Sequence, residues 1–455
     1  MFDIPELRPT SSSLRISPEV DVPVTSRVKR IIDTAAFRRL SRVSQLGLVS
    51  MVYPGASHTR FEHSLGVYRN AIHYVQQLQN DPIFCMHIEE ESVLCFLLAA
   101  LLHDIGHWPF CHAIEDLRLE GLPRHESLAR SLLRSDELAE AIRSDWGLDP
   151  EKIANIIAPD KGGPDASPTQ RILKSMLSGP IDIDKLDYLE RDSLHAGVPY
   201  GRNFDRNRLV RSLCIHPETF ELAITDKGKT AAEMMVFARY VMFSEVYWHH
   251  AVRSATAMLH RAVHSLRAHW CQQGADISKL TSGWLQCTDA QLMDQLLDAS
   301  RDHPWFPCVD GLFGAKRTLF KRVMQIDCLS HPELHRKLSR RPYAETVTIS
   351  ERLATLLAGR LQREVSSLDI LVDAPPMKLE VQFRIEVKQR GGEFRSLGEL
   401  SPMVQSLATK QFDDIVKRVR VFVSPELAIA VKEHSIDVVE LVTQASDEGS
   451  RNNVG

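Results

Sequence analysis

The stretch LLHDIGHWPFCH, residues 101–112, ends an apolar run that extends from Val93 to Leu102. Leucine and alanine form helices and fill cores, so the run predicts a buried helix over residues 89–107. Histidine and aspartate are tolerated beside a core only where each finds a partner, because an unpaired buried polar group costs several kcal/mol. We therefore interpret His103, Asp104 and His107 as a functional cluster and not as isolated structural residues.

The bulk properties indicate an ordinary globular protein. The chain has 455 residues, of which 44% are hydrophobic and 25% charged, enough for one large domain and smaller ones. The net charge of -4 gives no reason to expect strong nucleic-acid binding through bulk charge. We expect no membrane association, because the longest apolar stretch is roughly half the length that crosses a bilayer. The eight cysteines contain no CxxC pair and the N-terminus lacks a signal-peptide pattern, so we expect a cytoplasmic protein with reduced thiols.

Hydrophobic periodicity predicts a helical body. After an extended, Pro- and Ser-rich arm over residues 1–25, apolar positions recur at helical spacing from Ser26. Residues 220–225 alternate like a strand and predict a small hairpin. Further helices are predicted over residues 61–78, 124–134, 136–145, 150–157, 168–178, 181–192 and 229–268, and residues 277–360 look helical with polar breaks.

The tail has a different pattern, in which strand-like and helical segments alternate after the DAPP sequence at 373–376. We therefore predict a mainly α protein: a helical bundle with a small hairpin, plus a smaller C-terminal α/β unit. The predicted boundaries are an arm at 1–25, a catalytic domain at 26–268, a helical extension at 269–365, the α/β unit at 366–445 and a flexible tail at 446–455.

Four residues are candidates for the ligands of one metal ion: His63, His103, Asp104 and Asp184. Imidazole nitrogens and carboxylate oxygens together suit a borderline divalent ion such as Mn, Fe, Co, Ni or Zn, or Mg at the hard end of the series. Four protein ligands on an octahedral ion would leave positions for water and substrate. Each residue alone has an ordinary structural explanation, and the HD dipeptide by itself is not specific.

Basic and polar residues accompany these candidates. Asp184, Tyr188 and Asp192 are four residues apart, which aligns them on one helix face, and this composition suits a lined pocket better than a core. Arg239, Phe243 and Tyr247 share the same spacing, although aromatic stripes of this kind are more often core packing. Three cations, Arg60, Lys185 and Arg239, could neutralise phosphates beside a metal, which favours hydrolysis of phosphoesters or anhydrides. Walker A, GxGxxG, HExxH and GxSxG motifs are absent from the sequence.

These residues resemble the HD superfamily of metal-dependent phosphohydrolases. The segments YPGASHTRFEHSLGV and PIDIDKLDYLERD are similar to the deoxynucleoside triphosphate triphosphohydrolase branch, which includes bacterial dNTPases and a vertebrate enzyme with an added SAM domain. The likeness extends over about residues 26–440, and no SAM domain precedes it.

The resemblance implies roles for particular residues. The metal ligands would be the four candidates above, and the histidines near the α-phosphate would be His107, His112 and His125. His112 would be the general acid, supported by Glu115, where the family often has aspartate. Phosphate contacts would come from Arg60, Lys185 and Arg239, contacts to the 3′-hydroxyl from Gln45 and Asp192, and sugar contacts from Tyr188 and Tyr247.

Several positions depart from the family pattern. Phe243 replaces a phosphate-facing histidine of the vertebrate enzyme, and Trp108 and Cys111 replace common glycine and serine. At the effector site Asp33 matches, whereas Arg38 and Ser41 replace a glutamine and an arginine. A nucleotide effector is therefore an open expectation, and Phe243 leaves room for a shorter or different phosphorylated substrate.

The first hypothesis is a metal-dependent enzyme that converts deoxynucleoside triphosphates to deoxynucleoside and inorganic triphosphate. The second is an HD phosphohydrolase acting on another substrate, such as a nucleoside monophosphate, an alarmone or an oligonucleotide end. The third is a regulatory protein that binds a nucleotide without turnover. The resemblance also implies a dimer or tetramer of identical chains.

Overall fold

The structure is a computed structural model that describes residues 2–9, 12–18, 20–122, 124–159, 166–375, 384–407 and 416–451; side chains at 280, 281 and 448–451 lie outside the description. The chain forms two compact units. The first contains Met1–Pro109, Pro123–Met242 and Gln382–Thr409, and the second contains Phe110–Leu122, Phe243–Val381 and Lys410–Gly455. Each unit is described by itself below.

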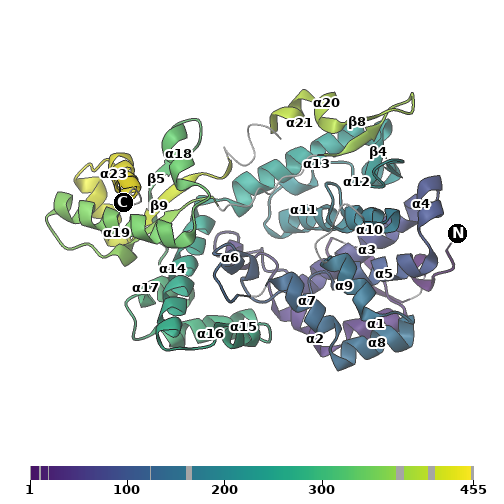
Figure 1. The fold of residues 1–455 in the computed structure, drawn as a ribbon, viewed down its shortest axis with the longest axis horizontal. Coiled ribbons are helices and arrows are strands. Elements are labelled where there is room, and N and C mark those ends of the chain that lie inside the picture. The colour runs from purple at the N-terminus through teal and green to yellow at the C-terminus, as the bar shows by residue number, and fades with distance from the viewer. Residues whose placement is uncertain are drawn as a thin grey trace. The chain divides into compact units, whose positions relative to one another are not determined.

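The first unit is a bundle of helices, as the periodicity predicts (Figure 1). Its centre is formed by α3, α5 and α11. Helix α3 packs against both of the others. Its described helices of four residues or more, apart from short 3-10 turns, are α1 (Ser26–Ile32), α2 (Ala35–Arg38), α3 (Arg60–Leu78), α4 (Pro82–His87), α5 (Glu90–Leu102), α7 (His125–Leu133), α8 (Asp136–Trp146), α9 (Pro150–Ile157), α10 (Pro168–Ser178), α11 (Ile183–His195), α12 (Arg206–Arg211), α13 (Lys229–Met242), α20 (Leu397–Leu400) and α21 (Pro402–Ser406).

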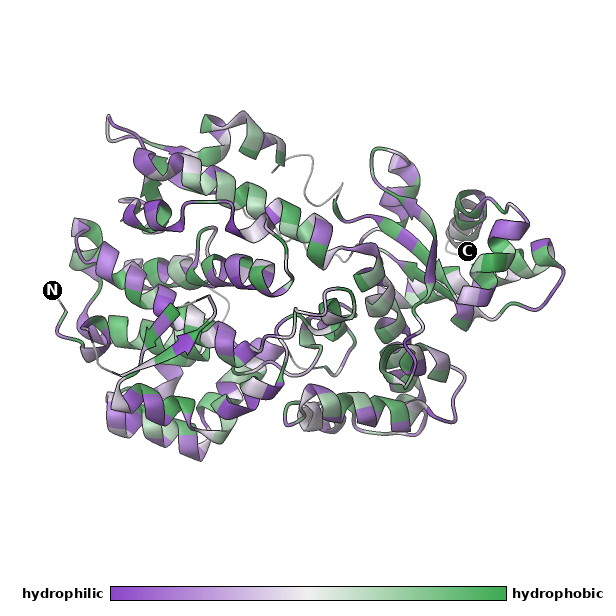
Figure 2. Cartoon of the chain, turned by 180° about the vertical axis from the view of Figure 1, so that it is seen from behind, coloured by the Kyte–Doolittle hydropathy of each residue, from purple (hydrophilic) through white to green (hydrophobic). Residues whose placement is uncertain are grey.

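Local sequence explains where these helices begin. The side chains of Thr59, Asp149 and Asp182 accept hydrogen bonds from the first-turn amides of α3, α9 and α11. Ser167 and Gln170 form a reciprocal capping box at the start of α10. Figure 2 shows hydrophobic and hydrophilic residues alternating around most of the helices, whereas α5 is buried along nearly all its length. The caps and the amphipathic faces are therefore local signals that fix helix starts and core faces.

The N-terminal arm contains an antiparallel hairpin of β1 (Ser13–Ile16) and β2 (Val20–Pro23). Before it, Glu6 is only 1% exposed. The Glu6 carboxylate accepts hydrogen bonds from Arg27 Nε at 2.9 Å, Arg27 Nη2 at 2.5 Å and Thr25 Oγ1 at 2.6 Å. Burial opposes ionisation of this carboxyl, but the hydrogen bonds and the charge of Arg27 outweigh burial and lower the pKa of Glu6. Glu6 thereby fastens the arm to α1.

Glu6→Gln should lower the free energy of unfolding by about 1–3 kcal/mol at pH 7, because the substitution removes the charge of a buried carboxylate that pairs with the half-buried Arg27. A carboxyl with a lowered folded-state pKa stabilises the fold above its unfolded pKa and loses that contribution as the pH falls through the folded value. Urea unfolding at pH 7 and pH 4 should therefore show a smaller difference from wild type at pH 4. The exposed Glu218→Gln variant is the control, and a pH-independent difference would contradict this role of Glu6.

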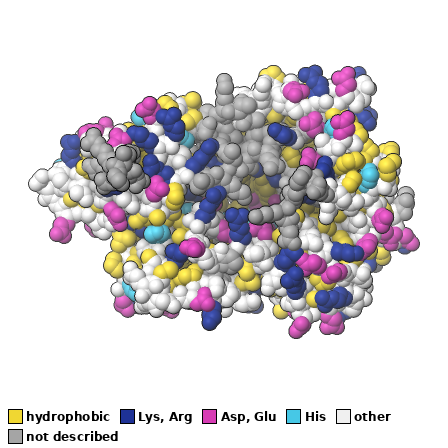
Figure 3. Space-filling model, in the orientation of Figure 1, with side chains coloured by type: hydrophobic (Ala, Val, Ile, Leu, Met, Phe, Trp, Pro, Cys, Tyr) yellow, Lys and Arg dark blue, Asp and Glu magenta, His cyan; other side chains and the backbone are white. Residues whose placement is uncertain are grey.

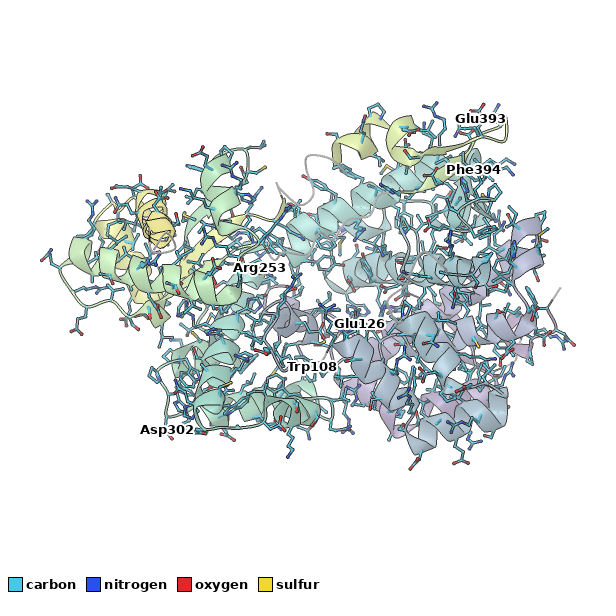
Figure 4. The ribbon with its side chains drawn as sticks, in the orientation of Figure 1. Trp108, Glu126, Arg253, Asp302, Glu393 and Phe394 are labelled. Atoms are coloured by element: carbon cyan, nitrogen blue, oxygen red, sulfur yellow. The ribbon has the colours of Figure 1, made fainter. Side chains whose placement is uncertain are left out.

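A four-stranded sheet in the first unit joins distant parts of the chain. Its order is β3 (Leu213–Ile215), β4 (Leu222–Thr225), β7 (Glu386–Lys388) and β8 (Phe394–Ser396). The predicted hairpin is present as β3 and β4, and β7 pairs in parallel with β4. Glu393 and Phe394, labelled in Figure 4, lie at the turn of the β7–β8 hairpin, where the Phe394 ring is 4.3 Å from the His216 ring.

The second unit combines helices with a three-stranded antiparallel sheet of order β5 (Lys321–Ile326), β9 (Val419–Val423) and β6 (Ile370–Asp373). Beside the sheet, Arg253, labelled in Figure 4, donates from Nη2 to Asp373 Oδ1 at 2.6 Å. The helices are α6 (Cys111–Glu115), α14 (His250–Gln272), α15 (Ile277–Trp284), α16 (Asp289–Ser300), α17 (Phe306–Phe313), α18 (Pro332–Leu338), α19 (Tyr343–Leu361), α22 (Pro425–Glu433) and α23 (Val438–Arg451).

The mainly α fold class with a smaller α/β part is confirmed, and several details differ from the sequence predictions. The predicted α/β unit at 366–445 contributes strands to two sheets, since β7 and β8 pair in the first unit. The segment 277–360 contains a strand, β5. Helix α23 extends into the predicted tail, whose last residues, 452–455, lie outside the described residues. These differences share one cause: strand pairing depends on distant partners that a local pattern does not contain.

Two predicted helices end earlier than expected. The helix predicted over 89–107 ends at Leu102, so His103 is its C-terminal cap and His107 lies beyond it. The helix predicted over 229–268 is interrupted by a π-helical turn, Phe243–Tyr247, before α14. The stripe of Arg239, Phe243 and Tyr247 therefore does not lie on one regular helix, because the turn alters the spacing.

The surface carries charges of both signs. Figure 3 shows basic and acidic side chains interspersed over the described part of one face. Within the described ranges, the helices include none with the length and apolar character needed to span a bilayer.

Candidate metal centre

Helix α3 holds the first candidate ligand, His63, one turn after its N-cap. Thr59 caps the helix, and His63 is 1% exposed. The same helix positions α11: Asn70 Nδ2 donates to the carbonyl of Ile183 at 2.9 Å, and Tyr74 Oη donates to the carbonyl of Ile181 at 2.7 Å. Two buried side chains of α3 therefore fix the start of the helix that carries Asp184.

The HD pair, His103 and Asp104, lies at the C-terminal end of helix α5. His103 Nδ1 donates to the carbonyl of Ala100 at 2.9 Å, one of the carbonyls that a helix end leaves without an amide partner. This hydrogen bond fixes the tautomer of His103 and leaves Nε2 with its lone pair free for a metal. Asp104 follows directly and is 5% exposed. The apolar helix thus ends in two polar groups whose orientation the backbone determines.

The four candidates from α3, the end of α5 and α11 lie together. His63 Nε2 is 3.3 Å from His103 Nε2 and 3.0 Å from Asp184 Oδ1. His103 Nε2 is 3.4 Å from Asp104 Oδ1 and 3.9 Å from Asp184 Oδ1. Ligands held about 2.1 Å from one ion at right angles are separated by roughly 3.0 Å, so this donor set fits a divalent metal. The Asp184 side chain is 34% exposed, so the cluster is accessible from the α11 side.

The charges in the cluster interact strongly. Burial opposes ionisation of Asp104, but His107, His103 and Arg60 outweigh burial and hold its pKa well below the ordinary value. Burial favours neutral His63, yet hydrogen bonds to Asp184 and Asp187 raise the pKa of His63 to about 10. Without a metal, the proton on His63 offsets the carboxylates. A metal ion would displace that proton, so metal binding and proton release should be linked.

Asp187 and Arg191, which the sequence analysis did not select, form the layer behind His63. His63 Nδ1 donates to Asp187 Oδ2 at 2.8 Å, which directs Nε2 toward the cluster. Arg191 donates to both oxygens of Asp187 at 2.8 Å, and its Nη1 donates to Glu62 Oε1 at 2.8 Å. The available sequence signal was the spacing of three residues from Asp184 to Asp187 and four to Arg191.

Close packing of α3 on α11 requires a glycine at position 66. A Cβ atom there would lie 1.9 Å from Asp187 Oδ1 and 2.4 Å from Arg191 Nη2. Gly106 has a similar role after the HD pair, because a Cβ atom there would lie 2.0 Å from the carbonyl oxygen of His125. Both glycines allow close approach of the segments that bear the site.

The predicted phosphate contacts lie in two settings: Arg60 contacts a candidate metal ligand, and Lys185 and Arg239 lie near Tyr188. Arg60, 3% exposed, donates from Nη1 to Asp104 Oδ2 at 2.7 Å, so it contacts a metal ligand directly. Its buried Nε has no hydrogen-bond partner among the described residues. Lys185 Nζ donates to Asp182 Oδ2 at 2.6 Å. Burial raises the pKa of Tyr188 while nearby Arg239 and Lys185 act to lower it, so these three side chains are electrostatic neighbours.

The predicted 3′-hydroxyl contacts lie on the same unit. His58 Nε2 is 2.9 Å from Asp192 Oδ1, and the His58 ring stacks on His195 at 4.4 Å. Gln45 donates its backbone amide to the carbonyl of His58, and its buried side-chain Oε1 accepts no hydrogen bond within the part of the chain that the structure describes. A buried amide oxygen without a donor is unfavourable, which is consistent with a ligand hydroxyl there.

Two of the remaining predicted histidines, His107 and His125, lie close together. His107 lies 3.2 Å from Asp104 Oδ1, and its ring is 3.9 Å from the His125 ring. Arg39, which the sequence analysis did not select, donates to the carbonyls of Ile105 and His107 at 2.7 Å and supports this turn. Trp108, labelled in Figure 4, is 1% exposed.

Three predicted site residues belong to the second unit. His112 and Glu115 lie on α6, and Tyr247 ends the π-helical turn. Their roles stay predictions.

Two protein-family models match successive parts of the chain. The model of the HD domain matches residues 60–192, and the model of the HD associated region matches residues 204–449. The chain belongs to the HD-domain family. The four candidate ligands lie within the first match, and the second match begins just before α12 and includes most of the second unit.

Individual relatives are similar to this chain over different shares of its length. The uncharacterized protein YwfO of Bacillus subtilis is 29% identical over 84% of this chain and 86% of its own length. The deoxynucleoside triphosphate triphosphohydrolase SAMHD1 of Mus musculus is 36% identical over 208 residues, which are 40% of this chain and 31% of that protein. Human SAMHD1 is 34% identical over 48% of this chain and 39% of that protein, so the chain spans less than half of either enzyme.

Solved structures support the fold. A hypothetical protein from Aquifex aeolicus superposes with a TM-score of 0.70 at 24% identity and covers 93% of this chain and 100% of its own. A phosphohydrolase from Bacteroides thetaiotaomicron gives a TM-score of 0.66 at 23% identity, covering 91% and 100%. At these identities the likeness is one of fold.

Asp187→Asn should weaken divalent-metal affinity roughly 10- to 100-fold, because His63 loses the carboxylate that orients its ring. Calorimetric titration of metal-stripped protein with Mn²⁺ measures the change in metal affinity. Glu190→Gln on the same helix is the matched control, since Glu190 pairs with Arg206. Equal metal affinities for Asp187→Asn and the control would show that Asp187 does not position His63.

Proposed function

We propose that the chain is a divalent-metal-dependent hydrolase of deoxynucleoside triphosphates that releases deoxynucleoside and inorganic triphosphate. The observation that carries the proposal is the cluster of His63, His103, Asp104 and Asp184, with Lys185 and Tyr188 on the same helix as Asp184 and Arg239 as their electrostatic neighbour. A nucleotide needs both a centre of positive charge and further cations along its phosphates. The dNTPase relatives match over the region that supplies these residues.

The chain's own residues would divide the work. A bound divalent ion would supply an activated water and offset negative charge at phosphorus. Lys185 and Arg239 would bind the phosphates, and Gln45 and Asp192 would hold the 3′-hydroxyl. We infer from the family resemblance that Tyr188 and Tyr247 contact the sugar, while His107 and His125 lie near the α-phosphate.

Proton delivery to the leaving 5′ oxygen would come from His112. Glu115, three residues later on α6, would hold the imidazole in its protonated form. We also propose that the chain forms a dimer or tetramer in the cytoplasm and that its response to a nucleotide effector depends on the altered positions Arg38 and Ser41.

Product analysis tests the activity. Wild type incubated with the four dNTPs and Mn²⁺ or Mg²⁺ should release inorganic triphosphate, whereas His103→Ala should lose both metal and turnover. Ion-exchange chromatography separates triphosphate from phosphate and pyrophosphate. Release of single phosphates, or turnover of dNMPs instead, would assign a different phosphohydrolase, and binding without turnover would assign a regulatory protein. A metal-free His103→Ala variant with full activity would overturn the metal centre.

Recognition of the 3′-hydroxyl gives a second test. Wild type should prefer a dNTP over its 2′,3′-dideoxy analogue by roughly ten- to a hundredfold in kcat/KM, because Gln45 Oε1 would remain unpaired with the analogue. Gln45→Ala should lose most of this preference, while the exposed Gln272→Ala should keep it. A preference that survives in Gln45→Ala would contradict the assigned contact.

A further inference from the structure

A hollow lies beside the candidate metal centre, and its lining includes none of the four candidate ligands. It is a partly open space of about 250 Å³, counting space continuous with solvent. Residues of α3, α11 and the start of α12 line it, together with Pro18 and Val20. Its lining residues are Pro18, Val20, Gly66, Arg69, Asp187, Glu190, Arg191 and Arg206. Three arginines therefore face two carboxylates in one small space.

Both carboxylates of the hollow already have strong partners. Asp187 accepts two hydrogen bonds from Arg191 and one from His63. Glu190 Oε2 accepts from Arg206 Nη1 at 2.9 Å, and Arg206 Nη2 donates to Asn70 Oδ1. These two carboxylates hydrogen-bond Arg191 and Arg206, and they act on a third arginine only at longer range.

Arg69 is that third arginine. It is half-buried on α3, and it makes no hydrogen bond or ion pair with any residue that the structure describes. Burial is the largest cause of a lowered pKa at Arg69, and the charge of Arg206 adds to it, whereas Glu190, Asp187 and Asp21 act to raise this pKa. His73, one turn later, adds no charge of its own, because burial, Arg69 and Arg206 lower its pKa to about 4 and leave the ring neutral.

A half-buried guanidinium beside another cation is unfavourable unless an anion compensates it. We propose that this hollow binds a small inorganic oxyanion, of the class of orthophosphate or sulfate, through the guanidinium groups of Arg69 and Arg206. Guanidinium groups present paired donors that match oxyanions. The enclosed part of the hollow is small, which favours an inorganic ion over a nucleotide.

The anion site shares Asp187 and Arg191 with the layer behind His63. None of its lining residues is a candidate metal ligand or phosphate contact, so anion binding can be measured without metal. Thermal unfolding of metal-stripped protein provides the first measurement. At constant ionic strength, phosphate or sulfate should raise the Tm of wild type by several degrees, because a ligand that binds only the folded state stabilises it.

The variants assign the effect to this hollow. Arg69→Gln should lose most of the phosphate-dependent rise in Tm, whereas Arg211→Gln, at the exposed end of the helix that begins with Arg206, should retain it. Arg69→Lys should keep part of the rise, since it keeps the charge but not the paired donors. An unchanged rise in Arg69→Gln, or no rise in wild type, overturns the proposal.

A crystallographic measurement decides the question even if Arg69→Gln fails to fold. Wild-type crystals soaked in millimolar selenate, whose selenium scatters anomalously, should show a peak within hydrogen-bond distance of Arg69 and Arg206. A map with selenate only at the candidate metal centre, or without a peak in this hollow, overturns the proposed site.

Discussion

The carboxylate of Asp187 is the interaction on which the candidate metal centre depends. It lies in the buried space between α3 and α11, where it accepts from His63 and Arg191 at the same time. An unpaired charge in such a place would be costly, so the pairing determines how closely the two helices approach and how the His63 ring is turned. Gly66 makes the approach possible, and Glu62 and the backbone of Ser17 complete the partners of Arg191.

Buried polar groups that lack partners identify the places where a ligand would complete the structure. Most buried polar atoms in folded proteins are hydrogen-bonded, so exceptions are informative. Among the described residues of the first unit, such atoms include Gln45 Oε1 and Arg60 Nε, which belong to predicted nucleotide contacts. Others, such as Ser64 Oγ, Tyr68 Oη and Trp146 Nε1, belong to residues with no assigned ligand. Arg69 is an exception of another kind, a half-buried charge beside a hollow and outside that group. The same reasoning therefore supports the substrate contacts and the separate anion site.

Periodicity predicted the helical body well because the helices carry their own signals. Asp149 and Pro150 mark the start of α9, and the Ser167–Gln170 capping box marks the start of α10, at the predicted residues. Features with non-local causes were missed. Strand β5 has its partner almost a hundred residues later, in β9, and β7 pairs with β4 across a still longer separation, from Ile224 to Val387. The π-helical turn at Phe243–Tyr247 interrupts a run that contains no proline or glycine, so no local signal predicts it.

The sequence by itself determined the helical class, the residue types of the metal candidates and the apolar helix that ends in His103 and Asp104. Those properties follow from local composition and residue spacing, which can be read from each segment of the chain by itself. Only the tertiary structure decided that His63 Nδ1 faces Asp187, that Arg60 contacts Asp104, and that Arg69 forms no hydrogen bond or ion pair with a described residue. These contacts join or separate groups that are distant in the chain, 124 residues in the case of His63 and Asp187, and they exist only once α3, α5 and α11 have packed.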